Sequence, residues 1–166
     1  LFSGIRENVQ ISDLHGWTLF FSKPYRHRTT MADFVPPDAE LRGGSLLVGA
    51  RRRGAEVLSV AAMGNADVVA KERRWSLQVR SWTHLHNGVH WYCCDGISVG
   101  FSPSEEVDLR YYADLAEQSS PLRLSWDLND FGGWRAGASL DLHESEEWEK
   151  VLFASPARIS AGPDGE

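Results

Sequence analysis

Three histidines lie close together in the segment His84-Leu85-His86-Asn87-Gly88-Val89-His90. On an extended strand, His84 and His86 would present both imidazoles on one face, and a third histidine could complete a metal site. No acidic residue follows at the spacing that a metal-binding His-x-His strand would use, and Gly88 separates His86 from His90. One hypothesis is therefore a metal-dependent enzyme that uses His84, His86 and His90. We favour the alternative of a polar turn, and expect neither a metal nor a cofactor.

A second group of residues combines aromatic rings with side chains that form hydrogen bonds. Aromatic faces stack on sugar rings, and neighbouring Asn, Asp and Arg side chains hold hydroxyl groups. The chain has seven tryptophans, of which we expect about four or five to be mainly buried, because small β-domains fill their cores with large rings. Trp134 stands beside a Gly-Gly turn and an arginine and is the main surface candidate. The predicted ligand-binding residues are Trp91, Tyr92, Asn129, Asp130, Trp134 and Arg135.

Other catalytic patterns are weaker. The chain contains no Gly-x-Ser-x-Gly nucleophile elbow. The acids between residues 127 and 147 could in principle supply a carboxylate pair for glycoside hydrolysis, but the sequence selects no pair. Adjacent cysteines on a strand point to opposite faces, so Cys93 and Cys94 are predicted to be free thiols rather than a disulfide. We therefore expect no catalytic residues.

Charge and composition narrow the function classes. The net charge is -6, with 17 basic and 23 acidic residues, which argues against a nucleic-acid partner bound over a broad basic face. The triple-arginine turn at residues 51–53 could hold an anion, but a solvated hairpin tip is the simpler interpretation. No apolar run approaches the length of about 20 residues that a membrane-spanning helix requires.

The elements that would position these residues are mostly short strands. A polar loop at 23–40 is predicted to contain a helical turn near 31–34, and a helix is predicted over 103–117, where Ser104 could cap it. A basic turn at 51–54 predicts a hairpin, and the Asn87-Gly88 pair predicts a turn before the strand at 89–94. Strands are predicted at 17–22, 45–50, 56–62, 67–70, 75–82, 89–94, 97–101, 122–128 and 148–153.

This count of about eight to ten strands with little helix predicts an all-β fold, an antiparallel sandwich or barrel-like single domain. A parallel sheet is disfavoured because helical segments between the strands are missing. The predicted domain covers residues 1–154. Residues 155–166 turn to Pro, Ala, Gly, Ser and Asp and are predicted to be a flexible tail.

Several stretches together suggest a family. They comprise residues 16–20, 46–50, 58–64, 87–92, 98–102, 123–126, 133–137 and 148–153. In this order they resemble a poorly characterised Trp-rich β-module found in secreted or surface proteins of algae, protists and some marine organisms. The resemblance implies no established activity. In that module the Trp-Tyr pair after the Asn-Gly-Val turn is kept while the histidines vary, which weakens the metal hypothesis.

The same resemblance bears on localisation. The chain begins with Leu1, and we expect an extracellular or organelle-lumen protein after removal of a presequence. Many members of the module carry cysteines around the second strand pair, and this chain has none there, which puts an extracellular location in doubt. Residues 16–19 also echo the start of fibrinogen-like lectins, without their cysteine and calcium pattern.

Two main hypotheses for function remain. The first is a non-enzymatic ligand-binding module, with carbohydrate as the favoured ligand. The second is an accessory structural subunit whose Trp-rich surface docks on a larger protein assembly. The metal-dependent enzyme is a third alternative.

Overall fold

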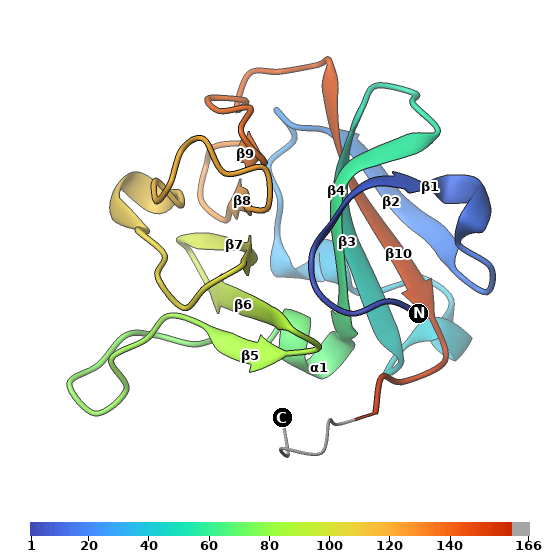
Figure 1. Cartoon of the computed structure of the whole chain (residues 1–166), viewed down its shortest axis with the longest axis horizontal. Coiled ribbons are helices and arrows are strands. Elements are labelled where there is room, and N and C mark those ends of the chain that lie inside the picture. Colours follow the sequence, from blue (N-terminus) through green and yellow to red (C-terminus); the bar gives the residue numbers. More distant parts are fainter. Residues whose placement is uncertain (161–166) are drawn as a thin grey trace.

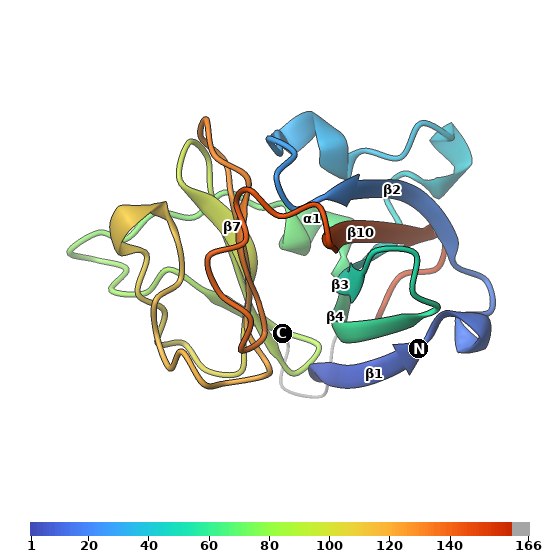
Figure 2. The same cartoon turned by 90° about the horizontal axis from the view of Figure 1, so that it is seen from above.

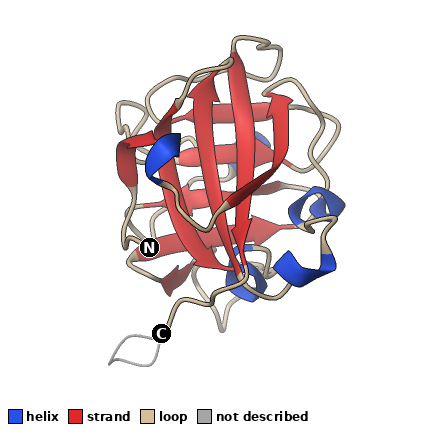
Figure 3. Ribbon diagram, turned by 90° about the vertical axis from the view of Figure 1, so that its right-hand side faces the viewer, coloured by secondary structure: helices blue, strands red, loops and turns tan. Residues whose placement is uncertain are grey.

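Ten strands form two five-stranded antiparallel sheets within residues 1–160, which are the residues that the computed structural model describes. The sheets pack face to face, and Figure 2 shows them from above as two separate layers. Figure 3 shows that their strands run across each other. The prediction of an all-β antiparallel sandwich is confirmed; the sheets do not close into a barrel.

The first sheet has the strand order β1-β4-β3-β10-β2. Its centre is built from long, apolar strands, and the hairpin of β3 and β4 turns at Gly54 with a positive φ of 71°. Along β10, every residue pairs with β3 on one side, and most also pair with β2 on the other. The strands are β1 (Arg6–Gln10), β2 (Thr18–Pro24), β3 (Ser45–Arg52), β4 (Val57–Asn65) and β10 (Trp148–Ser155).

The second sheet has the simple order β5-β6-β7-β8-β9. The predicted turn joins β5 to β6, where Asn87 and Gly88 have φ values of 53° and 72°, as a two-residue hairpin loop requires. Residues 84–86, predicted as part of a polar turn, form the edge strand. The strands are β5 (His84–His86), β6 (Val89–Cys94), β7 (Ser98–Ser102), β8 (Leu124–Asp127) and β9 (Gly133–Ala136).

The helical elements of the described chain are all short, as Figure 1 shows. The predicted helical turn near residue 31 is confirmed by η2, where Thr30 and Asp33 form a capping box. No helix in residues 1–160 is long and apolar enough to cross a membrane. The helical elements are η1 (Ile11–Asp13), η2 (Met31–Phe34), η3 (Ala39–Leu41), α1 (Ala66–Val69) and η4 (Arg110–Tyr112).

The main core lies between the sheets. It receives alternate residues from the central strands of both, such as Val48 and Leu152 from the first sheet and Trp91 and Phe101 from the second. A second apolar cluster covers the outer face of the first sheet, around Met63 and Phe153. Among the tryptophans, Trp91, Trp126 and Trp148 are buried, Trp17, Trp82 and Trp134 are half-buried, and Trp75 is exposed.

Three predicted elements are wrong. Residues 67–70 lie mostly in α1 rather than in a strand. Residues 75–82 alternate in polarity like a strand, but they form a loop that extends beyond the second sheet without a neighbouring strand to pair with (Figure 1). The predicted helix over 103–117 is an irregular loop with only the three-residue η4 inside it.

Of the predicted tail, residues 161–166 lie outside the described residues. Ser155 is the last residue of β10 and is buried. The chain then continues along the end of the first sheet, where the Ser45 hydroxyl donates to the Ala157 carbonyl. The Asn65 side chain exchanges two hydrogen bonds with the Ile159 backbone, at 2.9 and 2.7 Å.

Candidate functional site

Half of the predicted ligand-binding residues are buried. Strand β6 points Trp91 into the core between the sheets and Tyr92 to the opposite face, where loops cover it. Each ring is 1% exposed, and the Tyr92 hydroxyl donates to the Leu124 carbonyl at 2.9 Å. Arg135 is fully buried. Neither ring can stack on a ligand in this structure, and the Arg135 guanidinium cannot reach one, because all three side chains are covered by the rest of the protein.

Arg135 instead holds the loop that follows β7. Its guanidinium donates to the carbonyls of Ala116 and Glu117 at 2.6 and 2.9 Å. It also donates to the carbonyl of Gly137, the residue after β9, at 2.9 Å. It also reaches the carbonyls of Asp114 and Ser120, at 3.2 and 3.4 Å. A buried guanidinium satisfied entirely by backbone oxygens is a fixed part of the scaffold.

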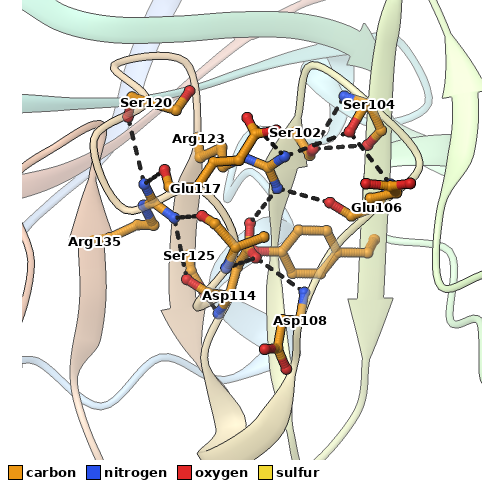
Figure 4. A network of polar contacts seen from close by, with 12 residues as sticks. Ser102, Ser104, Glu106, Asp108, Asp114, Glu117, Ser120, Arg123, Ser125 and Arg135 are labelled. Atoms are coloured by element: carbon orange, nitrogen blue, oxygen red, sulfur yellow. Dashed lines mark hydrogen bonds and ion pairs between the residues drawn. The ribbon is translucent and has the colours of Figure 1, made fainter.

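A second buried arginine acts on the same loop. Arg123 pairs with Asp114 at 3.1 Å, with both side chains fully buried, and donates to the Glu106 carbonyl at 2.8 Å. Figure 4 shows the two guanidinium groups and the Asp114 carboxylate converging on the loop. The two buried guanidinium groups and Asp114 thus satisfy polar backbone groups of this loop, which helical hydrogen bonds do not pair.

The loop held in this way forms one wall of a hollow lined by aromatic side chains. The opposite wall comes from the turn between β8 and β9 and from the segment before β10. The hollow has a volume of about 580 Å³. We call it the aromatic pocket, and the residues used below are Tyr111, Tyr112, Asp127, Phe131, Trp134 and His143.

The rings of the aromatic pocket remain accessible. Tyr111 is 84% exposed and Phe131 is 53% exposed, whereas most large rings of the described chain are at least half-buried. Tyr111 and Tyr112 both have a left-handed backbone, with φ of 57° and 68°. That conformation is uncommon for bulky residues and costs about 1 kcal/mol or more for each. The left-handed conformation of these two tyrosines therefore lowers the stability of the folded protein.

Polar atoms without partners occur at the same place. Asp127 is 4% exposed, and its Oδ1 has no hydrogen-bond partner. Trp134 Nε1 is likewise buried and unpartnered, and so is Nδ2 of Asn129, which is near in sequence but does not line the pocket. Buried polar atoms are nearly always satisfied in folded proteins. Asp127 and Trp134 both line the aromatic pocket, and these two buried atoms would have to be uncovered by a movement of the pocket wall to meet a bound molecule.

The electrostatics of Asp127 are unusual. Burial raises the pKa of its carboxyl to about 7, and the nearby Lys150 ammonium opposes the rise. Burial likewise lowers the pKa of Lys150 to about 7. Lys150 Nζ donates to the His27 carbonyl and to Thr29 Oγ1, both at 2.6 Å. The cation is therefore held on the side of the first sheet and does not satisfy Asp127 Oδ1 directly.

His143 lies between the two rings of the far wall. Its ring centroid is 5.3 Å from that of Trp134 and 6.2 Å from that of Phe131, both in edge-on arrangements. Its Nδ1 lies 3.1 Å from Asp141 Oδ1. The histidine thus packs edge-on against both rings and fixes their positions in the wall.

The remaining predicted site residues lie beside the pocket. Asn129 Oδ1 accepts a hydrogen bond from the Phe131 amide at 3.0 Å, which shapes the turn that displays Phe131. Asp130 is exposed and lines a smaller polar hollow on the other side of Phe131. Of the six predicted residues, only Trp134 lines the aromatic pocket.

The three histidines of the metal hypothesis do not converge. His86 is buried and its Nε2 accepts the Asn65 amide at 3.0 Å. His84 contacts the Arg73 guanidinium at 2.8 Å, and His90 contacts Thr83 Oγ1 at 3.3 Å. No group of three His, Cys, Asp or Glu side chains suited to a metal ion occurs within residues 1–160.

The two cysteines are buried, and two of the three arginines of the turn at 51–53 contact other residues of the protein. Cys93 and Cys94 are free and buried on opposite faces of β6, as predicted. In the turn, Arg51 pairs with Glu149 at 3.3 Å, and Arg52 stacks over the Trp148 ring at 4.4 Å. Arg52 and Arg53 are both exposed near the hairpin tip.

Sequence reasoning missed Tyr111, Tyr112, Phe131 and His143. A sequence signal for Phe131 does exist, because an apolar ring inside the polar turn at 129–133 is expected to be exposed rather than buried in the core. The tyrosines were hidden by the helix prediction. Comparisons of the chain with protein-family models, with curated proteins and with solved structures found no match. The resemblance to the Trp-rich β-module therefore stays a prediction.

Proposed function

We propose that the protein is a non-enzymatic binding module that takes a carbohydrate in the aromatic pocket. The observation that carries this proposal is the combination of displayed rings with a buried, unpartnered carboxylate oxygen on Asp127. The rings offer faces on which a sugar ring can stack. Asp127 Oδ1 and Trp134 Nε1 supply one acceptor and one donor for hydroxyl groups once the pocket wall moves to uncover them.

A purely apolar ligand fits these features less well. It would stack on Tyr112 and Trp134, but it would leave Asp127 Oδ1 and Trp134 Nε1 without partners in a drier site. An unsatisfied buried polar atom costs about 1–3 kcal/mol. A sugar carries both an apolar face and hydroxyl groups, so it can satisfy both kinds of surface at once.

The two alternatives have less support. Docking of an accessory subunit would be favoured by a flat aromatic patch, whereas these rings line a hollow. A metal-dependent enzyme would need a cluster of ligands, and His84, His86 and His90 contact separate partners.

A glycan array with the full chain would test the proposal, followed by calorimetry on the strongest hit. We expect Trp134→Ala and Tyr112→Ala each to weaken binding by about tenfold or more, because each removes a stacking face. Asp127→Asn keeps the shape but changes the hydrogen bonding, and should alter which sugars bind.

Leu85→Ser and Trp75→Ala provide matched controls, since both side chains are exposed but lie outside the pocket. They should bind as the parent does. An array without hits, or a hit that Trp134→Ala and Tyr112→Ala both leave unchanged, would show that the pocket is not a carbohydrate site.

A further inference from the structure

The loop over residues 71–82, called here the Trp75 loop, extends from the second sheet between α1 and β5. Figures 1 and 2 both show it extending away from the first sheet. Three apolar side chains near its end face solvent: Trp75, Leu77 and Val79 are 44%, 71% and 40% exposed. Apolar side chains gathered on a protruding loop are unfavourable in water unless something covers them.

The base of the Trp75 loop is firmly anchored. The Arg73 amide donates to the Cys93 carbonyl at 2.8 Å, and its side chain contacts His84 and the Ser81 carbonyl. Trp82 packs against the cluster on the outer face of the second sheet. The loop is therefore held out from the body by fixed contacts at both ends.

The tip of the Trp75 loop has local order as well. The Ser76 amide donates to the Val79 carbonyl at 2.9 Å, and the Val79 amide donates back to Ser76 Oγ at 3.0 Å. Arg80 Nε donates to the Leu77 carbonyl at 3.3 Å. These bonds close a turn that presents the apolar side chains outward, so their exposure follows from a defined backbone.

Basic residues flank this apolar tip. The segment holds Lys71, Arg73, Arg74 and Arg80 against the single acid Glu72, in a chain whose net charge is -6. Lys71, Arg74 and Arg80 are exposed. The partner that complements this loop must therefore be apolar at its centre and anionic around it.

We propose that the Trp75 loop docks the protein on an anionic lipid bilayer surface. Trp75, Leu77 and Val79 enter the region between headgroups and acyl chains, where tryptophan is favoured. Lys71, Arg74 and Arg80 stay at the headgroup level and contact lipid phosphates and carboxylates. The protein then lies on the membrane rather than crossing it.

A protein partner would complement this loop less well. Stable protein interfaces take about 800 Å² from each partner, spread over a broad patch. The exposed side chains here are confined to the end of one projecting loop. A bilayer accepts such a tip without matching its shape, and its binding strength follows the buried apolar area and the number of basic residues.

Sedimentation of the full chain with lipid vesicles would test this proposal. We expect binding to vesicles of phosphatidylcholine with about 30% phosphatidylserine, weak binding to phosphatidylcholine alone, and loss of binding as salt rises. The double variant Trp75→Ser, Leu77→Ser should bind about tenfold or more weakly. The double variant Arg74→Gln, Arg80→Gln should lose about fivefold for each arginine at low salt.

Matched variants elsewhere separate this effect from general surface chemistry. Val35→Ser removes an apolar side chain whose exposure, 54%, lies within the range of the loop residues, and the pair Lys23→Gln, Arg53→Gln removes two exposed charges. Both should bind vesicles as the parent does, and so should Trp134→Ala, which keeps this test independent of the carbohydrate proposal. No binding to anionic vesicles, or equal binding by parent and loop variants, would overturn the proposal. Self-association that Trp75→Ser, Leu77→Ser abolishes, without vesicle binding, would overturn it in favour of a protein partner.

Discussion

Single residues in this protein carry buried charge that the fold does not fully satisfy. Asp127 and Lys150 belong to different sheets and lie near the core between them, and burial brings both pKa values to about 7. For a carboxyl group the raised pKa reflects a penalty on its charged form. Buried carboxyl groups with strongly shifted pKa values are concentrated at functional sites, which is why Asp127 is the titratable group to test.

This penalty predicts a pH dependence of stability. The Asp127 carboxyl has an ordinary pKa of 3.8 in the unfolded chain and a pKa of about 7 in the folded one. Between these values the folded protein holds a proton that the unfolded chain releases, so stability falls as pH rises from about 4 to about 7. Relative to Asp127→Asn, the parent should lose about 2 kcal/mol between pH 5 and pH 7.5 in urea unfolding.

Asp130→Asn is the matched control, because Asp130 lies three residues away and is exposed. Its pH profile should follow that of the parent. Parallel profiles for the parent and Asp127→Asn would contradict the role assigned to this carboxyl.

The two cysteines give a second prediction at the scale of the residue. Burial raises the pKa of Cys93 to about 12 and that of Cys94 to about 11, so few thiolates exist near neutral pH. At pH 8, both should react with a disulfide reagent at least about a hundredfold more slowly in the folded protein than in urea. A fast native reaction, followed by absorbance, would mean that β6 opens locally.

At the scale of the element, the loop between β7 and β8 is held by side chains instead of by helical hydrogen bonds. The guanidinium groups of Arg123 and Arg135 donate hydrogen bonds to carbonyls of the loop, and Asp114 forms an ion pair with Arg123. This arrangement places Tyr111 and Tyr112 in left-handed conformations at the edge of the aromatic pocket. The buried arginines are therefore positioning residues for the pocket.

Arg135→Lys should release this loop. A lysine cannot reach the five carbonyls that the guanidinium contacts, so several buried oxygens lose their donors, at a cost of about 2–4 kcal/mol. Trypsin should then cut after the exposed Arg110 faster than global unfolding alone explains. Arg26→Lys, at an exposed ion pair, should change neither quantity. An unchanged cleavage rate after Arg110 would place the control of the loop elsewhere.

At the scale of the whole molecule, the two sheets are joined by a polar link inside the apolar core. Tyr25 follows β2, and its hydroxyl accepts from Trp126 Nε1 and donates to the Arg135 carbonyl, both at 3.0 Å. The absence of a side chain at Gly133 leaves room for the Tyr25 ring, since a Cβ there would overlap it. The link therefore ties the end of the first sheet to β8 and β9 of the second.

Tyr25→Phe should remove this link without changing the packing of the ring. Trp126 Nε1 would lose its acceptor in a dry site, at a cost of about 1–3 kcal/mol in the free energy of unfolding. Urea unfolding should remain a single transition with an unchanged slope, because both sheets share one core. Tyr112→Phe, at an exposed ring, should leave the midpoint unchanged. Two separate transitions would show that the sheets unfold independently.

The sequence by itself determined the strands whose apolar residues and turn residues agree. Residues 45–50 and 89–94 are mostly apolar, residues 148–153 end in the apolar run 151–153, and Gly54 and the Asn87-Gly88 pair supply the positive φ values of tight turns. These local signals sufficed for an all-β antiparallel fold, but they left a sandwich and a barrel-like domain open, and the two separate sheets of the structure decided for the sandwich. They also sufficed for free thiols at Cys93 and Cys94, because neighbouring residues of a strand face opposite sides.

Only the tertiary structure decided which aromatic residues are accessible. Whether Trp91, Tyr92 or Trp134 meets solvent depends on the layer that covers each face of a sheet, and no local pattern records that layer. The same holds for residues 103–117, whose helical composition yields to the long-range contacts of Arg123 and Arg135. The pocket is formed by side chains from the β7–β8 loop, from β8, β9 and the turn between them, and from the segment before β10, so its chemistry exists only once these segments have packed together.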